Sequence, residues 1–156
     1  MNIKILAFGK IKEDFLKAGI SEFSKRLTSY TSLEIVELQP VEIKDEALAG
    51  KVLNEEAEKV ISLLKPTDYV ITLEIDGKNL SSEMFAEKIK EIQNEGYGQL
   101  VFVIGSSCGL GEKIKAKANF KLSLSKMTFL HQFSRLILLE QIYRAFKIMN
   151  NETYHK

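Results

Sequence analysis

Two stretches in the second half of the chain carry residue types that could hold a small polar ligand. The first, Gly-Ser-Ser-Cys-Gly-Leu-Gly at residues 105–111, directly follows the apolar run at residues 100–104. Glycines tolerate positive φ angles and let a ligand approach the backbone closely. Their spacing matches neither the Walker loop nor the dinucleotide fingerprint. The loop is therefore compatible with a nucleotide-like ligand that needs no phosphate, and an ordinary strand-to-helix turn explains the same glycines.

The second stretch, residues 123–132, mixes three hydroxyl side chains with Leu, Met and Phe. Such a segment can bury apolar contacts while it presents backbone hydrogen-bonding groups. An adenine ring held between apolar side chains would suit it. A loop at the edge of the core that leads into the last helix accounts for the same residues, and the pattern alone favours that interpretation.

Basic residues are concentrated at the end of the chain. Residues 113–156 hold nine Lys or Arg and two acids, whereas the whole chain has a net charge of only +1. This asymmetry indicates a polyanionic partner as readily as it indicates a solvated basic face. Glu140 and Arg144 are spaced for a helical ion pair. For Arg135 and Arg144, contact with phosphate competes with ion pairing.

The last three residues, Tyr154, His155 and Lys156, combine a stacking ring, a proton carrier and a cation. A chain end normally frays, and position alone predicts that residues 150–156 fray. The lone Cys108 and two distant histidines predict no metal site and no internal disulfide, so we expect a reducing compartment. No apolar stretch approaches the ~18 residues of a membrane span, and the N-terminus indicates a strand instead of a signal peptide. The sequence therefore predicts a cytoplasmic protein with no membrane partner.

Strand-like apolar runs alternate with helical patterns along the chain, which predicts one α/β domain over residues 1–156. The predicted fold is a mostly parallel sheet of about five strands flanked by helices. Strands are predicted at residues 2–8, 32–38, 69–74, 100–104 and about 121–124, and the longer helices at 13–30, about 51–64, about 82–94 and 132–149. Residues 39–50 are predicted to form a mobile loop, and Asp76 with Gly77 a turn. Ligands of such sheets lie beyond the carboxyl ends of the strands.

The predicted last helix, residues 132–149, is apolar almost all round. A helix that packs on a sheet needs only one apolar stripe. This one therefore needs a second covering surface. A dimer interface would supply it, and so would deeper burial within one chain.

Taken together, three segments resemble the ribosomal RNA large subunit methyltransferase H family, a member of the knotted SPOUT class. They are Val103-Ile104-Gly105 with Gly109-Leu110, the run at residues 122–132, and residues 140–146 with the Tyr-His-Lys ending. The likeness extends over essentially the whole chain, including Gly9-Lys10 and residues 72–78. Each piece is common by itself, and their combination is specific.

The resemblance implies an S-adenosylmethionine-dependent enzyme that methylates N3 of a pseudouridine in 23S rRNA of the assembled ribosome. It also implies a C-terminal trefoil knot and a homodimer. Carried over by position, the cofactor-binding residues are Leu73, Gly105, Leu124, Ser125, Lys126, Met127, Thr128 and Phe129. Arg144, Tyr154 and His155 would be catalytic, with His155 as general base and Arg144 stabilising negative charge on the acceptor ring. Arg135, Arg144 and Lys156 would contact RNA, and no metal is implied.

Two positions depart from the family pattern. Relatives usually carry a second glycine where this chain has Ser106, and a proline where it has Leu130. The first change affects the approach to the cofactor, and the second the bend before the last helix. A non-catalytic RNA-binding factor that docks on the ribosome is the alternative function, since the basic segment would serve it equally well.

Overall fold

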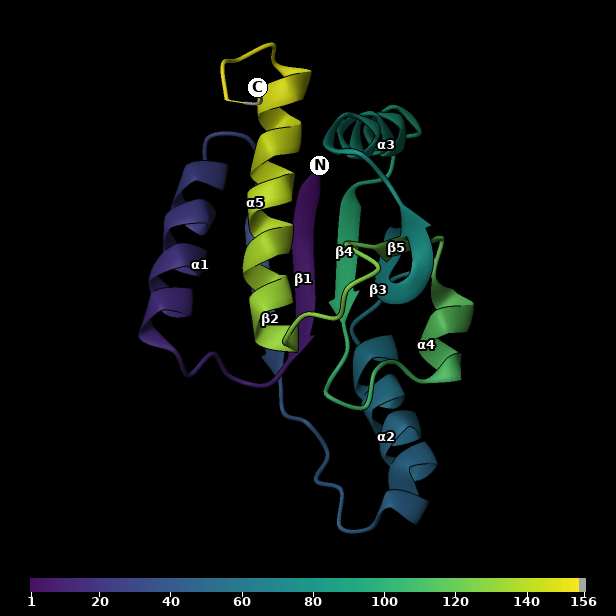
Figure 1. The fold of residues 1–156 in the computed structure, drawn as a ribbon. Helices are drawn as coiled ribbons and strands as arrows, with labels where there is room; N and C mark the ends of the chain where they lie inside the picture. Colours follow the sequence, from purple (N-terminus) through teal and green to yellow (C-terminus); the bar gives the residue numbers. More distant parts are fainter. Residues whose placement is uncertain (155–156) are drawn as a thin grey trace.

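The structure, a computed structural model, describes residues 1–154, and their five strands form a single sheet in the order β2-β1-β4-β3-β5 (Figure 1). Every neighbouring pair is parallel. The strands are β1 Asn2–Phe8, β2 Leu33–Leu38, β3 Asp68–Asn79, β4 Gln99–Ile104 and β5 Phe120–Ser123. The predicted parallel sheet of about five strands flanked by helices is confirmed.

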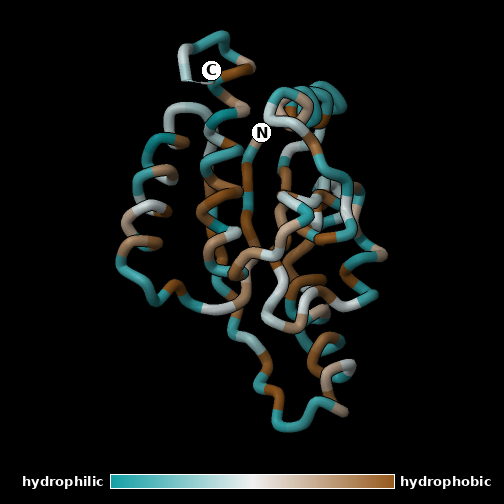
Figure 2. Tube along the Cα trace, in the orientation of Figure 1, coloured by the Kyte–Doolittle hydropathy of each residue, from teal (hydrophilic) through white to brown (hydrophobic). Residues whose placement is uncertain are grey.

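Helices connect these strands, because a parallel pair cannot be joined by a tight turn. They are α1 Asp14–Leu27, α2 Ala49–Ile61, α3 Ser82–Asn94, α4 Glu112–Lys117 and α5 His131–Met149, with a 3₁₀ turn η1 at Glu46–Leu48. One apolar core joins the sheet to α1, α3 and α5, and a second joins the other face to α2 and α4. Figure 2 shows the apolar residues concentrated along the central strands.

The central strand β4 is continuously apolar because both of its faces are buried. Phe102 and Ile104 face the core beneath α5, whereas Val101 and Val103 face the core beneath α2 and α4. All four side chains are at most 4% exposed. A strand covered on both faces gains hydrophobic stabilisation from every residue, so the alternation of an exposed strand disappears.

Two local predictions were wrong. Asp76 and Gly77 form no separate turn, because β3 continues to Asn79 through an irregularity in which Leu73 and Lys78 both align with Leu122. A side chain on Gly77 would lie 2.8 Å from the backbone of β5, so glycine permits this close approach. The expected loop at residues 39–50 is shorter than predicted, since Asp45 caps η1 by accepting a hydrogen bond from the Ala47 amide at 3.1 Å.

The parallel arrangement places the carboxyl ends of β1, β2, β4 and β5 at one edge of the sheet, beside the irregularity of β3 that follows Leu73. The chain leaves these four strands near Gly9, Gln39, Gly105 and Leu124. These segments are far apart in the sequence, yet the sheet topology brings them together. This edge is where α/β proteins bind their ligands.

Candidate functional site

A cavity of about 540 Å³ lies beyond the carboxyl ends of β4 and β5 and beside residues 73–76 of β3. We call it the first cavity. Its size falls in the range of small-molecule sites. Seven of the eight residues that the resemblance assigns to the cofactor line it: Leu73, Gly105, Leu124, Ser125, Met127, Thr128 and Phe129. The eighth, Lys126, belongs to the same loop but does not line the cavity.

At Gly105, which lines the first cavity, the glycine-rich loop packs closely against its own backbone. A Cβ atom at this position would lie 2.5 Å from the Gly109 carbonyl oxygen and 2.7 Å from its carbon. Gly109 itself adopts φ +84°, and its amide donates to the Ser106 carbonyl at 2.9 Å. The loop therefore folds back on Gly105 so tightly that no side chain fits there.

Ser106, one of the two departures from the family pattern, has a defined structural partner. Its hydroxyl donates to Glu56 Oε1 at 2.7 Å, and the other carboxylate oxygen accepts the Val41 amide at 3.1 Å. Glu56 is only 2% exposed, so it needs these donors. The serine consequently ties the glycine-rich loop to α2 and leaves the cavity wall intact.

The loop at residues 124–130 is ordered by its own hydroxyl groups. Ser123 Oγ donates to the Ser125 carbonyl at 2.9 Å, and Ser125 Oγ accepts the Met127 amide at 3.0 Å. Asn79 of β3 donates its side-chain amide to the Ser123 carbonyl at 3.1 Å. Leu130, the second departure, is 76% exposed and caps α5 with φ −55°, an angle that proline also adopts.

Sequence reasoning missed Lys115 and Ser134, which line the first cavity, whereas Glu74 and His131 fall within the segments at residues 72–78 and 123–132 that the sequence had pointed to. Glu74 accepts a hydrogen bond from the Thr72 hydroxyl at 2.6 Å and faces Lys115 Nζ at 3.8 Å. Their separation in the sequence gave no signal, because the strand order alone brings the exits of β3 and β5 beside α4. Only the general rule about strand ends pointed to this place.

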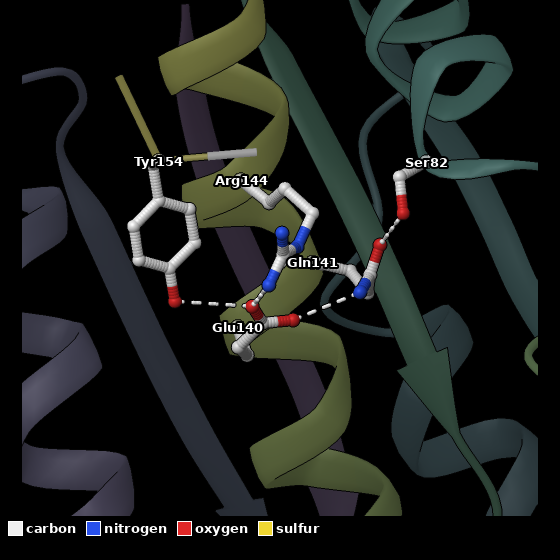
Figure 3. A network of polar contacts seen from close by, with 5 residues as sticks. All are labelled: Ser82, Glu140, Gln141, Arg144 and Tyr154. Atoms are coloured by element: carbon white, nitrogen blue, oxygen red, sulfur yellow. Dashed lines mark hydrogen bonds and ion pairs between the residues drawn. The ribbon is translucent and has the colours of Figure 1, made fainter. Parts of the chain in front are cut away.

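The predicted Glu140–Arg144 pair forms, and it is part of a cluster that includes Tyr154 (Figure 3). Arg144 Nε donates to Glu140 Oε1 at 3.0 Å, and the Tyr154 hydroxyl donates to the same oxygen at 3.1 Å. The guanidinium carbon lies 4.7 Å from the centre of the Tyr154 ring. Burial, then the nearby Glu140 carboxylate, raise the pKa of Tyr154 above its usual value.

The chain after α5 is folded back and held in place, against the expectation of fraying up to Tyr154. Glu152 accepts hydrogen bonds from the Tyr30 hydroxyl at 2.9 and 3.0 Å, and its carboxylate lies 2.7 Å from Lys147 Nζ. The turn uses Asn151 at φ 54°. Hydrogen bonds from Lys147 and then Tyr30 lower the pKa of Glu152.

Arg135 does not occupy the surface position expected of a phosphate contact. Its side chain is 2% exposed, and Nη1 lies 2.7 Å from Glu37 Oε2. Nη2 donates to the Gly9 carbonyl at 3.0 Å. The guanidinium thus joins the ends of β1 and β2 to α5, and the structure leaves it no free surface for RNA. His155 and Lys156 lie outside the described residues.

The first cavity borders the start of α5, whereas Arg144 lies in the second half of this helix and Tyr154 beyond its end. In Figure 1, α5 runs upward from its start toward the C-terminus at the top. The cavity uses only His131 and Ser134 from this helix, both in its first turn. Arg144 follows Ser134 by ten residues, which corresponds to roughly 15 Å along the axis. Methyl transfer needs reacting atoms within about 3–3.5 Å, which is much shorter than this separation along α5.

Within the part of the chain that the structure describes, no three His, Cys, Asp or Glu side chains gather as a metal site would require. Cys108 lines neither this cavity nor a metal cluster, and its amide donates to Ser106 Oγ at 3.3 Å. Among residues 1–154, no helix has the length and apolar character to cross a membrane.

The structure combines a parallel sheet with a cavity built from a glycine-rich loop and a second loop before the last helix, and this arrangement is consistent with the SPOUT class of methyltransferases. The model of a family described as "Predicted SPOUT methyltransferase" matches residues 1–155. Full-length relatives include the ribosomal RNA large subunit methyltransferase H of Finegoldia magna, 48% identical, and that of Clostridioides difficile, 49% identical. A putative ribosomal RNA large subunit methyltransferase H of Methanococcus vannielii is also 49% identical, and all three alignments cover 100% of both chains. The chain therefore belongs to the ribosomal RNA large subunit methyltransferase H family of SPOUT methyltransferases.

Proposed function

We propose that this protein transfers a methyl group from S-adenosylmethionine to N3 of a pseudouridine in 23S rRNA of the assembled ribosome. The observation that carries the proposal is the first cavity, where two loops of a SPOUT methyltransferase meet at the carboxyl edge of the sheet. Its full-length relatives are named as methyltransferases of the large-subunit ribosomal RNA. These names favour this function over a non-catalytic docking factor.

The lining of the first cavity suits S-adenosylmethionine. Leu124, Met127 and Phe129 offer apolar contacts for an adenine ring, and the nearby loop backbone offers hydrogen-bonding groups. Glu74 supplies a carboxylate within the same cavity, where it would attract the positively charged end of the ligand. When bound, the cofactor supplies an electrophilic methyl group on a sulfonium. The cavity residues would fix its position and keep water away.

We infer that the catalytic tail comes from a second copy of the chain. Arg144 lies roughly 15 Å along α5 from Ser134, which lines the first cavity, and Tyr154 lies beyond the end of that helix. A homodimer in which two α5 helices run antiparallel would place the tail of one copy beside the cavity of the other. Phe133, near the start of α5, is 38% exposed and offers an apolar contact for that partner.

In this arrangement His155 removes the proton from the acceptor nitrogen, and Arg144 stabilises the negative charge that the ring then carries. Glu140 and Tyr154 hold the Arg144 side chain in place through the contacts of Figure 3. Lys156 contributes a cation for RNA, whereas we omit the buried Arg135 from the RNA contacts. The protein would act in the cytoplasm and needs no metal for this chemistry.

Mass spectrometry of 23S rRNA from a deletion strain tests the activity. One methyl group is expected to be lost and to return with the wild-type gene. Calorimetry with S-adenosylmethionine tests the cofactor. If the wild-type protein binds no cofactor and restores no methyl group, the proposed enzyme activity is refuted and the non-catalytic docking factor is the function that remains.

Mixing two inactive variants tests the shared site. Gly105→Ala damages a cavity, and His155→Ala damages a tail while it leaves cofactor binding intact. Random pairing of the two chains produces an intact cavity with an intact tail at roughly a quarter of the sites. Recovery of about that share of wild-type methyl transfer is expected, and a mixture as inactive as its components would show that each chain uses its own tail.

A further inference from the structure

A second cavity adjoins the first at the same edge of the sheet. Its volume is about 620 Å³, and it lies beyond the carboxyl ends of β1, β2 and β4. The two cavities share Ser106, Ser107 and His131 as lining residues. A wall of three residues therefore separates them, and a ligand in one would lie next to a ligand in the other.

From this juxtaposition, we propose that the second cavity receives the acceptor nucleotide of the RNA, with Lys10 and Lys12 bound to its phosphates. The inference rests on the proposed methyl transfer. An in-line transfer requires that the acceptor atom lie directly beside the methyl donor. If the first cavity holds the donor, the acceptor must enter from a space that borders it, and the second cavity does so.

The side chains of the second cavity match the parts of a nucleotide. Lys10 and Lys12, both exposed, offer cations for the phosphates. Gln39 and Gln132 offer amide groups that can donate to or accept from the edge of a base. The remaining charged lining residue, Glu37, is already paired with Arg135, so its carboxylate repels a phosphate less.

The buried Arg135 explains how this cavity keeps its shape. It holds the Glu37 side chain and the Gly9 carbonyl, which come from the neighbouring ends of β2 and β1. Gly9 adopts φ +92°, and a Cβ on it would lie 3.9 Å from both His131 Nε2 and Pro40 Cγ. His131 lines both cavities and therefore stands at their boundary. Arg135 thus supports the wall of the second cavity.

The test is steady-state methyl transfer to ribosomes that lack the methyl group, with Lys10→Ala/Lys12→Ala compared with wild type. The KM for ribosomes is expected to rise at least tenfold, while the Kd for S-adenosylmethionine stays within a factor of two. Loss of two phosphate contacts also makes the dependence of log KM on log salt shallower, by about 0.7 to 0.9 for each contact. Lys90→Ala, an exposed lysine of α3, is the matched control and should change neither quantity.

A second variant, Gln39→Trp, fills the cavity without touching the first one. It should abolish methyl transfer and still bind the cofactor with the wild-type Kd. The proposal is overturned if the double lysine variant keeps the wild-type KM and salt dependence, or if Gln39→Trp transfers methyl groups at the normal rate. It is also overturned if Gln39→Trp converts the protein to monomers, because the cavity would then seat the partner chain. Wild-type protein that transfers no methyl group contradicts the proposed function instead.

Discussion

Replacing Gly105 by alanine should damage the cofactor site through a steric conflict that the backbone cannot avoid. The added Cβ would lie 2.5 Å from the Gly109 carbonyl oxygen, 2.7 Å from its carbon and 3.1 Å from Leu110 Cδ2. Relief of this conflict requires the glycine-rich loop to move by roughly 1 Å to regain an ordinary separation. That movement strains the loop, which the Gly109–Ser106 hydrogen bond and the Ser106–Glu56 hydrogen bond hold in place.

The expected cost to stability is about 1–3 kcal/mol, the range for overpacked interiors. For a chain of this length it corresponds to a fall in Tm of roughly 2–12 °C. Because the displaced loop lines the first cavity, the Kd for S-adenosylmethionine should rise at least tenfold, which is about 1.4 kcal/mol. Urea unfolding and calorimetry of the same preparations measure the two effects.

Gly50→Ala is the matched control. Gly50 lies in α2 with no atom within 4 Å of the position of its Cβ. Alanine there should stabilise the protein by roughly 0.5–1 kcal/mol, because it lowers the entropy of the unfolded chain without a clash. If Gly105→Ala binds the cofactor with the wild-type Kd and unfolds at the wild-type temperature, the steric reasoning is refuted.

Three further predictions concern the supports around the site. Arg135→Met should lower the free energy of unfolding by about 1–3 kcal/mol. The loss is smaller than for a fully buried ion pair, because the Glu37 side chain is 43% exposed. An unchanged urea midpoint would contradict a structural role for Arg135. Leu130→Pro should raise stability by about 0.4–1 kcal/mol, since φ is already −55° and proline restricts the unfolded chain; a lower Tm would show that the bend before α5 cannot accept it. Tyr154 should titrate above the usual phenol pKa of 10, so its contribution to stability is complete below pH 10 and is lost as the pH rises through the folded-state value. An absorbance titration compared with Tyr154→Phe measures this, and a phenol that ionises at or below pH 10 would contradict the packing in Figure 3.

The parallel α/β fold could be predicted from the sequence because its signals are local. The continuous apolar run of β4 indicates a strand buried on both faces, and both cores confirm it. The start of α3 is also a local feature, because the Ser81 hydroxyl accepts a hydrogen bond from the Met84 amide at 3.1 Å. The extension of β3 through Gly77 could not be predicted, because it depends on how closely the backbone of β5 approaches.

The residues proposed to bind the cofactor also divide into those with a local sequence signal and those that only the tertiary structure brings to the site. Gly105 and the loop at residues 124–129 attract attention by composition, although composition alone also allowed an ordinary turn for the first and favoured a core-edge loop for the second. Lys115 carried no such signal, and neither Glu74 nor His131 was assigned a role by itself. The strand order β2-β1-β4-β3-β5 placed all three at the cavity. A sequence shows which side chains are available, but proximity depends on strand pairing between residues far apart in the chain.

The sequence by itself determined the types of element, the family resemblance and the basic character of residues 113–156. Only the tertiary structure decided what individual charges do. Arg135 and Arg144 look alike in the sequence, yet one is buried between Glu37 and Gly9 and the other belongs to a partly exposed cluster with Glu140 and Tyr154. The physical reason is that a guanidinium acts through the groups it touches, and those groups come from β1, β2 and the folded-back tail. Their meeting with α5 depends on the assembled sheet and helices, which no local pattern records.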